Sequence, residues 1–211
     1  MTAMATPTNS ANAPVSLIYQ PPSFFERLDL ARFFAQAQPL EVELGCGDST
    51  VIVELARRQP AHNFIGVERL RGRIRKLDRK GRRAVLTNLC GLRIEAAYCL
   101  EHLLPLASVT ALHVYFPDPW PKRRHWGNRL VNVRFTELAS QILVPGGVVY
   151  LRTDDVPYFQ QMTEVFAASK AFQAVETPPE LSEILTDFER DFLAKGIQTN
   201  RAAYRLKTKT E

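Results

Sequence analysis

Residues 40–49, LEVELGCGDS, decide the fold class of this chain. The segment from Leu40 to Leu44 has the composition of a strand, and a helix is expected from about Ser49 to Gln59. Between them, two glycines let the backbone turn tightly and approach a ligand, while the first amides of the helix remain free to donate. This arrangement is typical of the first unit of a nucleotide-binding α/β fold, although a plain tight turn has the same composition.

Strands and helices are expected to alternate along the rest of the chain. Helices are expected in the basic segment after residue 68, at 97–104 and at 129–143, before a Pro-Gly-Gly turn at 145–147. The expected strands are 63–67, 89–94, 111–116 and 148–152, with two more in the tail at 172–175 and 203–206. Such alternation predicts right-handed βαβ units, and therefore a mostly parallel central sheet with helices on both faces.

The length and composition indicate one α/β domain. The chain has 211 residues, of which 45% are hydrophobic, enough for one full-sized core. Residues 1–16 carry no charged side chain and are interpreted as a flexible tail. A helical extension over residues 17–38, its main helix capped by Ser23, and a catalytic domain over residues 39–211 complete the expected organisation.

Several classes of protein are disfavoured by composition. No apolar run reaches the length needed to span a bilayer, and the start of the chain does not resemble a signal peptide, so we expect a cytoplasmic protein without a membrane partner. Cys46, Cys90 and Cys99 are odd in number and lack metal-ligand spacing. We therefore expect buried thiols, with no disulfide framework and no metal site.

Basic residues are concentrated in one segment, from Arg69 to Arg83. It holds nine of the 27 Lys and Arg residues and one of the 22 acids, so it carries +8 and the remainder of the chain −3. This charge suits a nucleic-acid backbone, although a solvated helix face is the ordinary alternative. Helical spacing predicts one face shared by Arg71, Arg75, Arg79 and Arg82.

A second distinctive segment, Phe116 to His125, follows the strand expected at 111–116. Prolines at 117, 119 and 121 cannot donate backbone hydrogen bonds, so the strand must end and Asp118 is held in a stiff loop. Ligands of open α/β sheets bind at this carboxyl edge of the strands. The basic run that follows adds Arg123 and Arg124 as candidate contacts to RNA phosphates.

A carboxylate suited to ribose hydroxyls is expected at Glu68. It ends the second strand, 23 residues after Gly45, where nucleotide-binding folds place such an acid. It is also placed to cap the basic helix, and both roles are compatible. Oxidoreductases that use dinucleotides and methyltransferases that use S-adenosylmethionine share this layout. Only the proline-framed segment distinguishes between these two classes of enzyme.

Taken together, these motifs resemble the tRNA (guanine-N7)-methyltransferases of the bacterial TrmB type. The resemblance extends over about residues 40–206. Its motifs are ELGCGDS at 43–49, IGVE at 65–68, Glu95-Ala96, FPDPWPKRRH at 116–125, PGG at 145–147, Thr153-Asp154 and TDFE at 186–189. The order of the proline-framed motif and the T-x-F-E motif makes the resemblance specific.

The resemblance implies a Rossmann-like methyltransferase that moves a methyl group from S-adenosylmethionine to a guanine N7 of tRNA, in the variable loop. The implied cofactor-binding residues are Glu43, Gly45, Gly47, Glu68, Glu95 and Asp118, with Asp118 also catalytic. The implied substrate-binding residues are Lys122, Asp154, Thr186 and Glu189. Each of these four also has an ordinary structural explanation: a surface cation for Lys122, a helix cap for Asp154, and a capping box for Thr186 and Glu189.

The chain departs from the family pattern where Ser49 replaces a glycine, Glu95 replaces an aspartate, and residues 126–128 interrupt a basic run; basic residues are also missing near the N-terminus. These differences leave open a methyltransferase acting on another RNA or a small molecule. An RNA-binding protein with a degenerate cofactor pocket is also compatible with the sequence, as is, less favoured, a nicotinamide-dependent oxidoreductase. The sequence does not distinguish a monomer from a homodimer.

Overall fold

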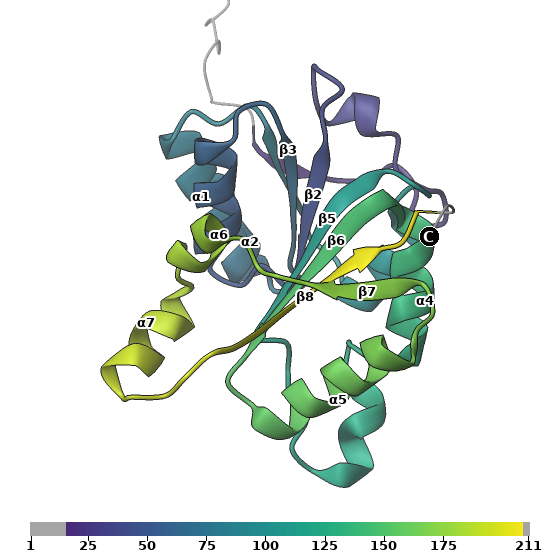
Figure 1. Cartoon of the computed structure of the whole chain (residues 1–211). Coiled ribbons are helices and arrows are strands. Elements are labelled where there is room, and N and C mark those ends of the chain that lie inside the picture. Colours follow the sequence, from purple (N-terminus) through teal and green to yellow (C-terminus); the bar gives the residue numbers. More distant parts are fainter. Residues whose placement is uncertain (1–15, 209–211) are drawn as a thin grey trace, which may run out of the picture.

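A single eight-stranded sheet organises the molecule (Figure 1). The computed structural model describes residues 16–208, so the tail expected at 1–16 lies almost entirely outside the described residues. The strands, in chain order, are β1 (Ile18–Tyr19), β2 (Leu40–Leu44), β3 (Asn63–Val67), β4 (Leu89–Leu92), β5 (Val109–Tyr115), β6 (Leu143–Thr153), β7 (Phe172–Val175) and β8 (Asn200–Leu206).

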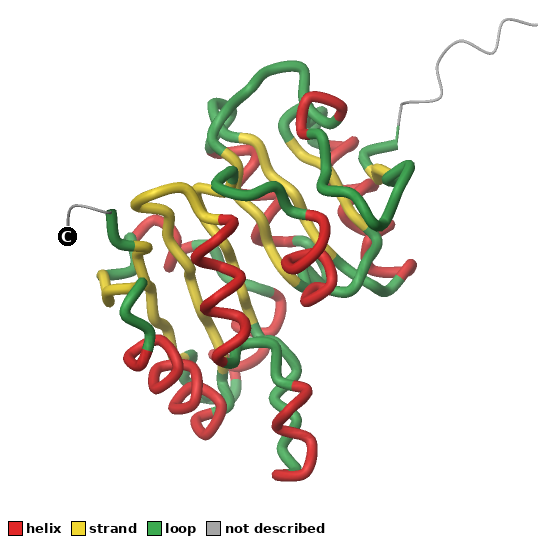
Figure 2. Tube along the Cα trace, turned by 90° about the vertical axis from the view of Figure 1, so that its right-hand side faces the viewer, coloured by secondary structure: helices red, strands yellow, loops and turns green. Residues whose placement is uncertain are grey.

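Helices cover both faces of this sheet, as the alternation predicts. In Figure 1, α1 and α2 lie on one side of the strands and α4 and α5 on the other; Figure 2 shows the strands between helices from a second direction. The helices are α1 (Thr50–Arg58), α2 (Arg71–Arg83), α3 (Ala96–Tyr98), α4 (Val133–Ile142), α5 (Val156–Ala168), α6 (Pro179–Glu183) and α7 (Asp187–Ala194).

The strand order is β1-β4-β3-β2-β5-β6-β8-β7. The chain moves outward from β2 through β3 to β4 and then returns to place β5 on the other side of β2. These pairs are parallel, and only β8 runs antiparallel to its neighbours β6 and β7. The reversal between β2 and β5 is a topological switch point, where open α/β sheets bind their ligands at the carboxyl ends of the strands.

The central strands are buried because helices cover them on both sides. Every residue of β2, β3 and β4 is buried, which is typical of parallel strands inside an α/β domain. Cys46, Cys90 and Cys99 are free thiols buried in this core, as expected. Burial raises the pKa of Cys90 and of Cys99 to about 12, so these two thiols are protonated packing groups.

The prediction of a helix after Ser23 is wrong. The region contains only the short strand β1 and one 3-10 turn, η1 (Leu30–Arg32). Tertiary contacts override the helical pattern here: the Leu28 amide donates to the Leu103 carbonyl at 2.8 Å, and the Arg27 guanidinium donates to Leu104. The backbone is thereby fixed to the end of a neighbouring helix, so residues 17–38 are an extended arm with a single helical turn.

Two other boundaries differ from the sequence prediction. The helix expected at 129–143 begins only at Val133, because the Asn132 side chain caps it by accepting from the Phe135 amide at 3.0 Å. The glycine turn at 145–147 lies inside β6. There the pairing with β5 jumps from Leu143 to Val148, so the turn forms an irregularity near the start of the strand.

Candidate active site

Two adjoining hollows open at the carboxyl edge of the central strands. The larger has a volume of about 350 Å³ and is lined by the ends of β2 to β5, including Gly45, Glu68, Glu95 and Asp118. The smaller, of about 170 Å³, is lined by Glu43, Gly47 and the start of α7. The two share Gly45, Arg73, Tyr115 and Phe116. All six predicted cofactor residues therefore lie at one continuous site.

The glycine turn after β2 has the backbone that its sequence predicts. Gly45 and Gly47 have φ values of 79° and 51°, in the left-handed region that favours glycine. A Cβ atom at Gly45 would meet no other protein atom within 4 Å, so it would project into the hollow. Ser49, where the resemblance implies a glycine, also has a positive φ of 62° and is buried. The departure therefore preserves the turn at the cost of a less favourable residue.

Glu68 is fixed at the end of β3 by backbone amides. One carboxylate oxygen accepts from the Leu70 amide at 2.7 Å and the other from the Gly47 amide at 3.2 Å. The side chain is 5% exposed, yet it lines the larger hollow. Each carboxylate oxygen has a second lone pair for a ligand hydroxyl. Glu68 thus joins the glycine turn to the start of α2 and retains accepting capacity in the hollow.

Glu95 and Asp118 complete the larger hollow from β4 and β5. The Glu95 carboxylate accepts from the amides of Ala97 at 3.0 Å and Tyr98 at 2.8 Å and so caps α3. Asp118 is exposed and makes no hydrogen bond or ion pair with any residue in 16–208. Leu70, Ile94 and Ala96 add an apolar wall. An ionisable group without a protein partner in a polar hollow is available to a ligand.

The loop that carries Asp118 is conformationally strained. Phe116 and Trp120 have φ values of 49° and 45°, which bulky side chains rarely adopt. The Arg129 guanidinium donates to the Pro119 carbonyl at 2.8 Å and stacks over the rings of Trp126 and Tyr158, at 4.6 and 4.7 Å. The prolines and this buried arginine together hold the strained loop in place.

Glu43 lies in the smaller hollow with a pKa raised to about 8. Complete burial is the main cause, opposed by the nearby charge of Arg152 and by the Ile52 amide, which donates to the carboxylate at 3.1 Å. At neutral pH the side chain is therefore mostly protonated. It differs in this respect from a solvated acid such as Asp48, whose pKa is lowered by its hydrogen bond with Lys76.

The T-x-F-E segment forms the capping box that its sequence allows. The Thr186 hydroxyl accepts from the Glu189 amide at 3.0 Å, and the Glu189 carboxylate accepts from the Thr186 amide at 2.8 Å. Glu189 has no exposed surface, and its carboxylate also receives Arg152 at 3.0 Å and Arg201 at 2.7 Å. Thr186 lines the smaller hollow, whereas Glu189 acts on the site only by placing α7.

Lys122 and Asp154 lie on exposed loops beside the hollows without lining either one. The cap of α5 is Asp155, which accepts from the Tyr158 amide at 2.7 Å, so the interpretation of Asp154 as a helix cap is wrong. Arg123 and Arg124 are exposed in the 3-10 helix η3 (Arg123–Asn128). The structure therefore places these four side chains at the surface.

The cations of α2 fall into partnered and unpartnered sets. Lys76 binds Asp48 at 2.7 Å, and Arg82 pairs with Asp78 at 3.3 Å. Arg71, Arg75 and Arg79 are exposed and have no hydrogen bond or ion pair with any described residue. Three of the four arginines expected on one face are therefore free, while the fourth is neutralised within its own helix.

The sequence alone did not identify three arginines of the site, two of which are buried and one of which lines both hollows. Arg129 supports the loop that carries Asp118, Arg152 supports α7, and Arg73 lines both hollows. Arg152 is 1% exposed in an otherwise apolar strand, and an isolated cation in such a strand is the signal that could have identified it. No comparable signal distinguishes Arg73 from its basic neighbours.

Two further observations concern the described part of the chain. Within residues 16–208, no group of three or more His, Cys, Asp or Glu side chains is placed to hold a metal ion. None of the helices in that same range has the length and apolar composition to cross a bilayer.

Comparison with known proteins places these features in a family. A family model described as a putative methyltransferase matches residues 37–203. A tRNA (guanine-N(7)-)-methyltransferase of Halorhodospira halophila is 34% identical over 87% of this chain and 81% of its own length. A protein of the same name from Syntrophotalea carbinolica is 33% identical, over 80% of this chain and 74% of its own.

Solved structures support the fold independently. The 16S rRNA methyltransferase KamB superposes with a TM-score of 0.64 at 17% identity, covering 87% of this chain and 95% of its own. An S-adenosylmethionine-dependent O-methyltransferase from Thermotoga maritima gives 0.55 at 12% identity, over 83% of this chain and 62% of its own. At these identities the comparison shows a shared methyltransferase fold.

Proposed function

The chain belongs to the tRNA (guanine-N7)-methyltransferase family, and on that basis we propose that it transfers a methyl group from S-adenosylmethionine to a guanine N7 of tRNA, in the variable loop. The observation that carries the proposal is the position of Asp118. An unpartnered carboxylate, held in a strained, proline-framed loop, faces the same hollow as Gly45 and Glu68.

The hydrogen-bond acceptors of the larger hollow suit S-adenosylmethionine. Glu68 offers carboxylate oxygens to ribose hydroxyls, and Glu95 offers acceptors to the adenine amino group at the next strand end. The open space over Gly45 permits close approach of the ligand to the backbone. Gly47 and the protonated Glu43 extend these contacts into the smaller hollow. When bound, the cofactor supplies an electrophilic methyl group on a sulfonium.

The residues of the site have to align the acceptor and tolerate charge. Guanine N7 carries a lone pair and no proton, so no general base is required. The Asp118 carboxylate accepts hydrogen bonds from the amino and imino edge of guanine and favours the positive charge that develops on the purine. The strained loop fixes this carboxylate before the substrate arrives, so little reorganisation is needed during the reaction.

Aromatic side chains beside Asp118 provide walls for an extruded base. Trp120 lines the larger hollow and is 36% exposed, while Phe116 lies between both hollows. Stacking on such rings holds a flipped base without reading its identity. We assign base recognition to Asp118, and contacts with the tRNA around the base to Lys122, Asp154 and Thr186. Glu189 contributes by positioning α7.

The basic surface supplies affinity for the RNA backbone. Arg71, Arg75 and Arg79 project unpartnered from α2, with Arg82 partly neutralised beside them. Arg123 and Arg124 add charge next to the catalytic loop. Phosphate contacts of this kind position an RNA without specifying its sequence.

The direct test is incubation of the purified protein with radiolabelled S-adenosylmethionine and unmodified tRNA, followed by nuclease digestion and nucleoside chromatography. Label in 7-methylguanosine, mapped to one variable-loop position, is the expected result. Label in another nucleoside would show that the methyl acceptor is not guanine N7. Absence of label with every RNA offered would contradict the proposed activity.

A further inference from the structure

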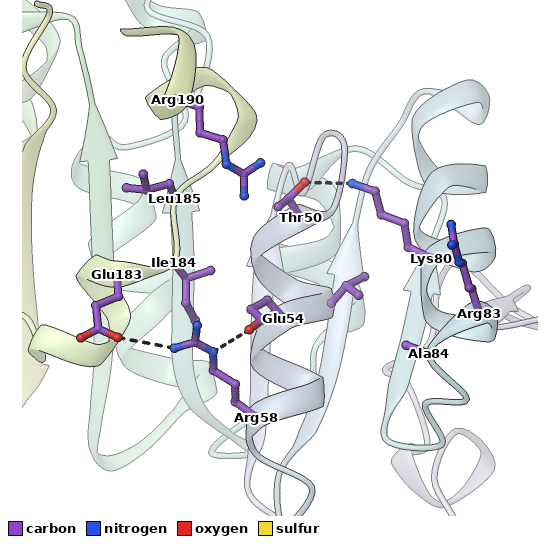
Figure 3. A pocket seen from close by; sticks show the side chains of 11 residues that line it. Thr50, Glu54, Arg58, Lys80, Arg83, Ala84, Glu183, Ile184, Leu185 and Arg190 are labelled. Carbon is purple, nitrogen blue, oxygen red and sulfur yellow. Dashed lines mark hydrogen bonds and ion pairs between the residues drawn. The ribbon is translucent and has the colours of Figure 1, made fainter. Parts of the chain in front are cut away.

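A second basic depression lies beside the reaction site, between α1, α2 and the segment that joins α6 to α7 (Figure 3). We call it the α1–α2 groove; its volume is about 540 Å³. The lining residues that matter here are Thr50, Arg58, Lys80, Arg83 and Arg190, with the acids Glu54 and Glu183. None of these residues belongs to the two hollows at the strand ends except Thr50.

The charges of the α1–α2 groove do not cancel. Arg58 contacts both acids, since it binds Glu54 at 2.6 Å and lies 3.7 Å from Glu183, and Arg57 also binds Glu54 at 2.7 Å. Three further cations line the groove, Lys80 and Arg83 from α2 and Arg190 from α7, so its lining residues carry four positive charges against two negative ones. Arg83 makes no hydrogen bond or ion pair within the described chain, and Arg190 has one partner, Asp187, at 2.7 Å. The groove therefore presents a net positive charge with unused donors.

Lys80 fixes the orientation of the side of α2 that carries Lys80 and Arg83. Its ammonium group donates to the Thr50 hydroxyl at 2.8 Å and to the Asp48 carbonyl at 2.7 Å, so this side of α2 faces α1 (Figure 3). Arg83 follows three residues later and lies on the same side of the helix. Lys80 lies about 100° around the helix from Arg79, and Arg83 lies between the two, so this side of α2 adjoins the row of Arg71, Arg75 and Arg79.

The groove continues from the reaction site. Thr50 lines both the groove and the smaller hollow, and its hydroxyl lies 3.1 Å from both carboxylate oxygens of Asp187. This contact forms the boundary between the two spaces, and Arg190 stands on the groove side of it. A strand of RNA that leaves the hollow across the start of α1 would therefore enter the groove directly.

We propose that the α1–α2 groove binds the sugar-phosphate backbone of tRNA next to the nucleotide in the reaction site, with Lys80, Arg83 and Arg190 as phosphate contacts. The proposal rests on the tRNA-methylating function proposed above. The positive charge of the groove and its continuity with the smaller hollow both favour binding of a polyanion. The apolar side chains of Val53, Ile184 and Leu185 leave room for ribose against the walls.

The test combines charge removal with charge retention. We would compare the parent, the double variant Arg83→Gln/Arg190→Gln and the double variant Arg83→Lys/Arg190→Lys in tRNA binding over a range of KCl concentrations. Loss of two phosphate contacts should reduce the log-log salt slope by about 1 to 2 units and weaken binding about 5- to 20-fold at low salt. The lysine variant should retain most of the slope. The KM for tRNA should rise in the glutamine variant, with kcat and S-adenosylhomocysteine affinity unchanged.

A control variant and a second ligand separate the competing explanations. Arg134→Gln removes an exposed arginine from α4 on the opposite face of the sheet and should leave the slope unchanged. A parental slope in the glutamine double variant, or an equal loss in Arg134→Gln, would overturn the proposal. Calorimetry with inorganic phosphate tests whether the groove instead binds a free anion. If the parent binds phosphate and the glutamine double variant does not, while the tRNA salt slope is unchanged, the proposal is also overturned. If the parent methylates no tRNA, the proposed function itself fails. That outcome is distinct from any change in the salt slopes, because the slopes measure binding alone.

Discussion

Glu68 at the end of β3 and Glu189 in α7 are both buried acids with both carboxylate oxygens hydrogen-bonded, yet they are held in opposite ways. Glu68 accepts from two backbone amides at the edge of the site and still faces the larger hollow. Glu189 accepts from Arg152 and Arg201, side chains of β6 and β8, and faces no hollow. The side of the site that we propose for the cofactor is thus built from strand ends, and the side that we propose for the substrate is held by long-range ion pairs.

This difference has a consequence for stability. A carboxylate held by backbone amides beside a solvated hollow can be removed with modest loss, because water replaces it. A carboxylate that neutralises a buried guanidinium cannot, because Arg152 would remain charged and 1% exposed. The two sides should therefore respond differently to mutation.

The largest effect is expected for Glu189→Ala. Removing one partner of a buried ion pair should lower the free energy of unfolding by about 3–5 kcal/mol, measured by urea denaturation. Glu183→Ala, at an exposed acid of the same region, is the control and should change it by less than about 0.5 kcal/mol. A loss below about 1 kcal/mol in Glu189→Ala would show that the ion pair does not hold α7.

The next effect concerns turnover. Asp118→Asn should lower kcat by roughly a hundredfold to a thousandfold, equivalent to about 2.7–4 kcal/mol, because it removes an aligned electrostatic partner of the transition state. Single-turnover methyl transfer with saturating tRNA measures it, and urea denaturation checks the fold. Turnover within a few-fold of the parent would remove Asp118 from the catalytic role.

Glu68→Ala should affect the cofactor alone. Loss of a charged hydrogen-bond acceptor should weaken S-adenosylmethionine by about 1.5 to 3 kcal/mol, while tRNA affinity stays nearly unchanged. Calorimetry and filter binding on the same preparation give both numbers. Equal weakening of the two ligands would indicate that the glycine turn and the start of α2, which Glu68 also joins, have been disturbed.

The sequence predicted which acids meet at the strand-end edge of the sheet for a topological reason. Glu43 lies at the end of β2, while Glu68, Glu95 and Asp118 follow β3, β4 and β5, and parallel pairing of these strands brings their ends to one edge. Local spacing was sufficient there, as it was for the glycine turn. The same spacing gave the right helix for α2, and the structure then showed that Arg82 is paired with Asp78.

The substrate side could not be predicted in this way. The contacts of Glu189 depend on where β6 and β8 pair, information that no short motif contains. The N-terminal arm failed for a related reason, since the Leu28 amide is satisfied by Leu103, far along the chain. Arg129 lies only ten residues beyond Pro119, but the stacking that holds it on Trp126 and Tyr158 is tertiary.

The smallest effects per residue are expected on the RNA-facing surface. Changing Arg71, Arg75, Arg79 and Arg82 to Gln together should reduce the magnitude of the tRNA salt slope by roughly 3 units, most of it from the three unpartnered arginines. Lys122→Ala, a single contact, should reduce it by less than one unit. An unchanged slope in the fourfold variant would show that this face of α2 is only solvated, and would move the RNA toward the catalytic loop and α7.

The most direct test of the central claim needs no RNA. Titration calorimetry of the parent protein with S-adenosylhomocysteine, and separately with NAD, asks which ligand the strand-end hollow accepts. We expect saturable one-to-one binding of S-adenosylhomocysteine, weakened in Glu68→Ala, and no binding of NAD. Binding of NAD in place of S-adenosylhomocysteine, or binding of neither ligand, would contradict the assignment of Gly45, Glu68 and Asp118 to a methyltransferase site.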